Sequence, residues 1–147
     1  MRYISLLNCI QFCLFCNLFG QKRCDTLRTD MIFTVTEVSP KSNITYEELE
    51  NLLNNNINIK EFEKPPGDMI YLTFTINCKG EAFDYKFFRS VDKKLQDNIL
   101  GVIVNNMNWM PAQQNSRKVD FQKNISIKIE KNNKFNVLDE KEQKKIK

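Results

Sequence analysis

The sequence predicts an α+β fold in two layers, a three-stranded antiparallel sheet with two helices on one face. Three observations support this prediction. Two stretches that alternate apolar and polar residues flank a glycine turn, a third alternating stretch follows near residue 125, and two further stretches carry apolar residues at helical spacing. The predicted order is helix, strand, turn, strand, helix, strand, all within residues 44–131.

The composition is typical of one small globular domain. The chain has 147 residues, of which 41% are hydrophobic and 11% aromatic, so there is enough apolar material for a core. The net charge of +4 is spread along the chain, which does not favour nucleic-acid binding. With no histidine and only four scattered glycines, the sequence predicts no enzyme, no catalytic residue, no metal site and no cofactor.

Residues 1–20 have the pattern of a secretory signal peptide. Arg2 precedes the apolar run Ile4–Phe19, and a helix of that length reaches about 24 Å, short of the roughly 30 Å of a bilayer core. Gly20 is a small residue suited to cleavage, which would leave Gln21 as the new N-terminus. A short, uncleaved membrane anchor is the alternative.

The predicted cleavage also decides which cysteines the mature protein would keep. Cys9, Cys13 and Cys16 lie inside the apolar run and would be removed with it. Cys24 and Cys78 would remain, and in an exported protein they can form a disulfide bond or stay as two thiols.

Residues 21–43 form a lead-in to the domain. The stretch 31–38 is rich in β-branched residues and predicts a short strand or an extended arm, which ends before Pro40. Thr45 and Glu48 then have the spacing of a capping box, and a stripe of leucines follows. The first helix is therefore expected to end near residue 55. Its apolar stripe consists of Leu49, Leu52 and Leu53.

A hairpin follows the proline-rich loop at residues 64–67. Apolar residues alternate through Ile70–Ile76, which predicts a half-buried strand. Asn77–Gly80 is the expected turn, because Gly80 can adopt the positive φ that such turns need. The return strand has Phe83, Tyr85 and Phe87 on one face and Asp84 and Lys86 on the other.

The second helix is expected from about residue 93 to residue 106, with Asp92 as its N-cap. Trp109 and Pro111 end it, because proline cannot continue a helix and the indole can hold the corner against the core. A polar loop is expected at residues 113–118.

The last predicted strand lies within residues 119–130, where Lys123 interrupts the apolar face and indicates a bend or bulge. Residues 132–147 are expected to be a charged tail. A small open sheet has exposed edges that can accept a strand from another protein, and this long strand is the predicted edge. Its predicted partner-binding residues are Val119, Asp120, Phe121, Gln122, Lys123, Asn124, Ile125, Ser126 and Ile127.

Four stretches together resemble the TonB C-terminal domain family. Residues 68–80 resemble its first strand and glycine turn, residues 89–92 its strand-to-helix junction, residues 109–112 its Trp-x-Pro corner and residues 32–35 its lead-in. The resemblance covers about residues 31–131. It implies a periplasmic module that binds a short extended segment of an outer-membrane receptor by strand addition.

The sequence departs from a full TonB energy transducer in three respects. It lacks a long proline-rich spacer, its apolar N-terminal run has no histidine, and Ser116-Arg117 stands where a glycine commonly precedes the last strand. We therefore expect an exported binding module in the periplasm or cell envelope whose partner is an outer-membrane receptor segment or another envelope protein. The alternatives are an abbreviated transducer held by an uncleaved anchor and a homodimer paired through strand edges.

Overall fold

The computed structural model describes residues 31–88 and 91–138 of the chain. The predicted signal peptide, the lead-in up to residue 30 with Cys24, and residues 139–147 lie outside this range. The helices are α2 (Tyr46–Asn56) and α3 (Lys93–Asn106), with short 3₁₀ helices η1 (Ile59–Glu61) and η2 (Pro66–Asp68). The strands are β1 (Lys41–Ser42), β2 (Met69–Ile76), β3 (Ala82–Phe88), β4 (Trp109–Met110), β5 (Ala112–Gln114), β6 (Arg117–Val119), β7 (Phe121–Ile129) and β8 (Phe135–Leu138).

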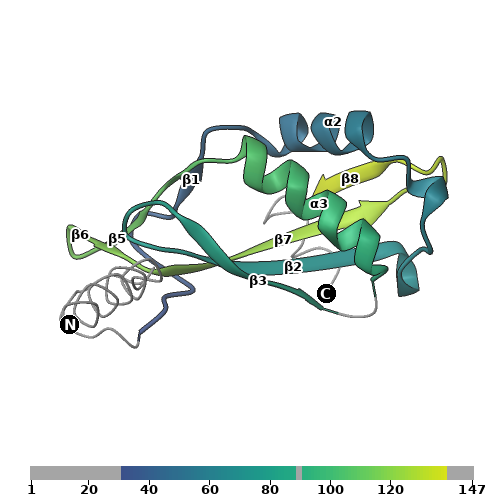
Figure 1. Ribbon diagram of the computed structural model, residues 1–147. Helices are drawn as coiled ribbons and strands as arrows, with labels where there is room; N and C mark the ends of the chain where they lie inside the picture. The colour runs from purple at the N-terminus through teal and green to yellow at the C-terminus, as the bar shows by residue number, and fades with distance from the viewer. Residues whose placement is uncertain (1–30, 89–90, 139–147) are drawn as a thin grey trace, which may run out of the picture.

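The described residues form an α+β fold in which both helices cover one face of the main antiparallel sheet (Figure 1). That sheet has four strands in the order β3-β2-β7-β8, so the prediction of a three-stranded sheet is wrong. Two further pairs, β1 with β4 and β5 with β6, form separate two-stranded sheets. The sequence therefore predicted the fold class and missed part of the strand content.

The fourth strand comes from a segment that the sequence assigned to the charged tail. A tight turn reverses the chain after β7: Glu130 donates its backbone N–H to Lys134 O at 2.8 Å, and Asn133 donates to Glu130 O at 2.9 Å. Strand β8 then pairs antiparallel with β7 from Ile129↔Phe135 to Ser126↔Leu138. Phe135 is fully buried, and the gain from burying its ring outweighs the polar character of the residues around it.

Both predicted helices form with their expected caps. Thr45 and Glu48 make the capping box, and the hydrogen bonds that Glu48 receives from Thr45 lower the pKa of its carboxyl. Asp92 caps α3 by accepting the backbone N–H of Leu95 at 3.0 Å. The extended backbone at Ile57 ends α2.

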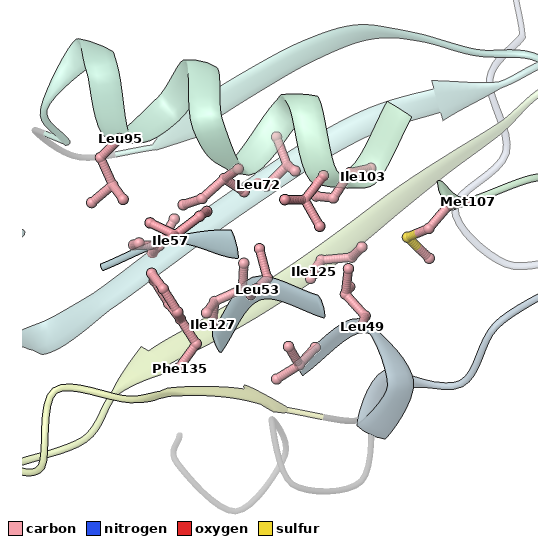
Figure 2. Packing of buried hydrophobic residues seen from close by; sticks show 14 of the residues in the cluster. Leu49, Leu53, Ile57, Leu72, Leu95, Ile103, Met107, Ile125, Ile127 and Phe135 are labelled. Carbon is pink, nitrogen blue, oxygen red and sulfur yellow. The ribbon is translucent and has the colours of Figure 1, made fainter. Parts of the chain in front are cut away.

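The core lies between the two helices and the sheet (Figure 2). Leu49 and Leu53 of α2 and Ile103 of α3 point at the strands, where Leu72 and Ile125 meet them. These side chains are almost wholly removed from water, and each contributes roughly 1.5–3 kcal/mol of transfer free energy. Helices and sheet therefore stabilise each other through one continuous cluster.

The hairpin of β2 and β3 has the predicted turn. Gly80 has φ +86° and donates its backbone N–H to Asn77 O at 2.9 Å. The ladder is regular from Tyr71↔Phe88 to Thr73↔Lys86, and then it shifts register between Thr73 and Thr75. Asp84 lies at this irregularity with φ 56°, a left-handed conformation that aspartate tolerates better than most residues. The shift is a β-bulge that alternation alone did not reveal.

The segment predicted as a polar loop at residues 113–118 is a second hairpin. Ala112, Gln113 and Gln114 of β5 pair with β6 across a two-residue turn at Asn115 and Ser116. Both turn residues have positive φ, 50° and 59°, as a type I′ turn requires. Asparagine suits this conformation, whereas serine bears a cost that glycine would not.

Replacing Ser116 by glycine is expected to raise the free energy of unfolding by about 0.5–1 kcal/mol, because glycine removes the left-handed penalty at the cost of some chain entropy. Urea denaturation followed by circular dichroism measures the change. Asn115→Gly is the matched control and is expected to gain less. A loss of stability in the Ser116→Gly variant would contradict the assigned turn.

The lead-in forms an arm beside the second half of the domain, but the predicted short strand within residues 31–38 does not form: the chain bends at residues 34, 35 and 37 and makes isolated bridges at Phe33 and Val38. Phe33 donates its N–H to Asp120 O at 3.0 Å and accepts from Gln122 N at 2.8 Å, and Val38 exchanges two backbone bonds with Gln113. Strand β1 then pairs with β4. The arm is therefore part of the fold.

Candidate functional site

The strand predicted as the open edge, β7, is an interior strand. It pairs with β2 from Ile76↔Phe121 to Met69↔Lys128 on one side and with β8 on the other. The prediction that residues 119–127 offer an exposed edge is therefore wrong. The physical reason is that the chain turns back after Glu130 and lays β8 along the second half of β7.

The first half of β7 is covered by the lead-in arm. The outer backbone groups of Asp120 and Gln122 bond to Phe33, whose side chain packs with Ala112, Val119 and Phe121. Val119 itself belongs to β6. The Asp120 carboxylate accepts the backbone N–H of Cys78 at 3.2 Å, so it joins the β2–β3 turn to the start of β7. These residues support the fold more directly than they offer a binding surface.

Lys123 does not mark a bend or bulge. The ladder between β2 and β7 continues through Phe74↔Lys123 without a shift, so that prediction is wrong. The side chain is 6% exposed, and its ammonium lies 5.8 Å from the centre of the Tyr46 ring, in cation–π contact with α2. A cation within the helix-facing side of the sheet explains why the apolar alternation breaks there.

The outer edge of β8 is capped by side chains of α2. Asn54 accepts the backbone N–H of Phe135 at 2.8 Å and donates its own amide to Phe135 O at 3.0 Å. Glu50 accepts the backbone N–H of Val137 at 3.1 Å. These contacts occupy the places that a neighbouring strand would take, so the edge of β8 is closed by the helix.

Replacing Asn54 by leucine, which has a similar volume, is expected to lower the free energy of unfolding by about 2 kcal/mol, because both backbone groups of Phe135 lose their partner. Chemical denaturation measures the loss. Asn55→Leu, on the exposed side of the same turn, is the matched control and is expected to change stability by less than about 0.5 kcal/mol. Equal losses in the two variants would show that the cap contributes nothing.

The main sheet has two edge strands, β3 and β8; side chains of α2 cap β8, whereas no described strand pairs with the outer side of β3. The direction of its backbone groups follows from the ladder. Gln122 directs its N–H away from β2, toward Phe33, so its partner Thr75 directs its own backbone groups toward β3. Every second residue of β2, counted from Thr75, therefore also directs its backbone N–H and C=O toward β3.

The same alternation identifies the free groups on β3. Thr73 lies two residues before Thr75 and therefore exchanges hydrogen bonds with Lys86, its register partner. The neighbours of Lys86, Tyr85 and Phe87, then direct N–H and C=O outward. The open edge is thus the regular stretch Tyr85–Phe88, which begins after the bulge at Asp84.

Three residues that the sequence indicated for separate structural reasons meet at one corner. A Cβ placed on Gly80 would lie 2.1 Å from the carbonyl oxygen of Trp109 and 3.8 Å from Cδ of Pro111. The Trp109 ring is buried and packs against Phe74 with ring centres 5.6 Å apart. The turn of the β2–β3 hairpin is therefore held against the chain that follows α3.

Cys78, in that turn, takes part in a disulfide bond. It is the one cysteine among the described residues, so its partner lies outside them. The pairing of Cys24 with Cys78 stays a prediction.

Within residues 31–88 and 91–138, no group of three or more histidine, cysteine or acidic residues could hold a metal ion. No helix in the same residues has the length and apolar character needed to cross a membrane. Comparisons with protein-family models, curated proteins and solved structures found no match for this chain.

The sequence does not reveal the order of strands in the sheet, so β7 was predicted as an edge although it is an interior strand. Strand length and clean alternation favoured β7, yet both are also properties of an interior strand. The available signal for β3 was its position at one end of a hairpin, with Asp84 and Lys86 on one face and Phe88 breaking the alternation. Charged residues on a strand are typical of an exposed edge.

Proposed function

We propose that this chain is an exported, non-enzymatic binding module that takes up a short extended segment of another envelope protein along β3. The observation that carries the proposal is the edge Tyr85–Phe88, whose outer side no described strand pairs with and which has two sets of outward backbone groups. Such groups bind an extended peptide by adding a strand to the sheet. An outer-membrane receptor segment is the partner that the resemblance to the TonB C-terminal domain family favours.

The other edges support the choice of β3. Side chains of α2 close β8, and β7 is covered by Phe33 and by β8. The bulge at Asp84 limits pairing to the stretch that follows it, because a bulge turns the strand and interrupts the ladder. We therefore expect a short bound segment, roughly four residues, or about 13 Å, in length.

The proposed location rests on two features. The apolar run near the N-terminus has the pattern of an export signal. A disulfide bond at Cys78 suits the periplasm or another oxidising compartment, where such bonds persist. Both support a module of the cell envelope.

The test compares two substitutions at one position. Peptides are first selected from a random phage-displayed library against the wild-type protein, and their affinity is then measured for Phe87→Pro and Phe87→Ala. Both variants lose the ring, but proline alone removes the outward N–H and cannot donate to an added strand. We expect Phe87→Ala to keep most of the affinity and Phe87→Pro to lose at least tenfold.

Both variants are first shown to be folded by circular dichroism. If a folded Phe87→Pro variant binds the selected peptides as well as Phe87→Ala does, the partner does not use the backbone of β3. The proposal would also be contradicted if the library yielded no peptide whose binding is weakened by the Phe87→Pro substitution.

A further inference from the structure

The open edge of β3 has two different faces, and an added strand would place alternate side chains beside each. On the helix side, Tyr85 and Phe87 are partly exposed and continue the main core. The Tyr85 ring lies 5.2 Å from the Phe74 ring, and burial raises the pKa of its hydroxyl. A side chain added next to these rings would extend an apolar surface, so apolar residues are favoured there.

The opposite face combines one aromatic ring with charge. Phe88 is 53% exposed, although it is large and apolar, and Lys86 lies beside it on the same face. A hollow of about 250 Å³ opens here, and its lining includes Thr73, Asp84, Lys86, Phe88 and Gln122. It has room for the side chain of a bound segment.

Lys86 is the charge that such a segment would meet. Its ammonium donates to Asp84 at 2.8 Å, but its side chain is 62% exposed and an ammonium has three N–H donors, so it can also donate to a second carboxylate. Asp84 lies in the bulge with φ 56° and is not in register with an added strand. Within the regular stretch Tyr85–Phe88, Lys86 is the one charged residue, and its ion-pair partner Asp84 lies just outside that stretch.

We propose, on the basis of the proposed function, that the segment bound by β3 is apolar and carries a single acidic residue opposite Lys86. The three other positions lie opposite Tyr85, Phe87 and Phe88 and take apolar residues. Cross-strand pairs of opposite charge stabilise a sheet, and like charges destabilise it by a similar amount. Lys86 thus selects among extended segments that the backbone groups alone would accept equally.

A second copy of the chain is a weaker candidate for this edge. If residues 82–85 of a second copy paired antiparallel with β3, they would match the proposed pattern of apolar residues with one acid, because Asp84 would lie opposite Lys86 of the first copy. In that copy, however, Asp84 is itself in the bulge and already bonded to its own Lys86. The matching residues are therefore not in the extended conformation that pairing requires, and we assign the edge to another protein.

The test uses two short peptides with the palindromic cores Val-Val-Glu-Val-Val and Val-Val-Lys-Val-Val, flanked by glycine and serine. The palindrome places the central residue opposite Lys86 in either strand direction. Affinities are measured by fluorescence anisotropy for the wild type, Lys86→Gln and Lys86→Glu. The glutamate peptide is expected to bind the wild type about fivefold more tightly, with the preference lost in Lys86→Gln and reversed in Lys86→Glu.

Equal binding of both peptides to all three proteins would overturn the role of Lys86 and leave the proposed strand addition intact. Absence of binding by either peptide, to a protein that does bind library-selected peptides, would overturn the apolar pattern. A stable wild-type dimer in sedimentation that excludes both peptides would assign the edge to a second copy and overturn the inference.

Discussion

Replacing Gly80 by alanine is expected to lower the free energy of unfolding by about 3 kcal/mol, the largest loss that we expect from adding one methyl group to this chain. Alanine at φ +86° bears roughly 1–2 kcal/mol of left-handed strain. The new Cβ would also meet the Trp109 carbonyl oxygen at 2.1 Å, and moving that backbone costs about 1–3 kcal/mol more. Denaturant unfolding of the purified protein measures the sum.

Gly101→Ala is the matched control. Gly101 lies within α3, where a Cβ would have no other atom within 4 Å, so alanine should raise stability by about 0.5–1 kcal/mol through its better helix propensity. The two variants make the same chemical change with opposite expected signs. Similar effects at both positions would contradict the close contact between the hairpin turn and the chain after α3.

Truncating Trp109 to alanine is expected to cost about 3–5 kcal/mol, because it removes a ring that is 8% exposed and leaves a cavity beside Phe74. The loss should appear as a lower denaturation midpoint with little change in the slope of the transition. This residue holds the corner between α3 and β5, so its loss should also loosen the turn around Gly80.

Trp109→Phe separates the ring from the indole N–H. The buried Nε1 of Trp109 has no hydrogen-bond partner among the described residues, so phenylalanine should keep the aromatic packing without losing a hydrogen bond. We expect this variant to lose about 1–2 kcal/mol, well below the alanine variant. A loss as large as that of alanine would mean that the indole N–H makes an essential bond.

The sequence predicted those parts of the fold whose causes are local. The capping box at Thr45, the Asp92 cap and the turn at Gly80 each depend on residues within a few positions of one another, and all three form. The type I′ turn at Asn115 and Ser116 was missed although it is also local, because serine rather than glycine occupies the second position.

The parts that failed depend on distant residues. Strand β8 forms because Phe135 finds a buried place in a core built by α2 and β7, which its charged neighbours in sequence do not indicate. The order of strands in the sheet likewise depends on contacts between distant segments. The sequence therefore predicted β7 as the open edge, whereas in the structure β7 is interior and β3 lies at the edge. Lys123 was interpreted as an irregularity because its contact with Tyr46 joins residues far apart in the chain.

We propose that a partner strand adds to the outer side of β3. Amide hydrogen exchange, measured residue by residue by NMR with and without a library-selected peptide, tests it most directly. We expect slower exchange at Tyr85 and Phe87, whose N–H groups point outward, and little change at Lys86, which already bonds to β2. Unchanged exchange at Tyr85 and Phe87, with slowing confined to β7, β8 or the helices, would contradict it.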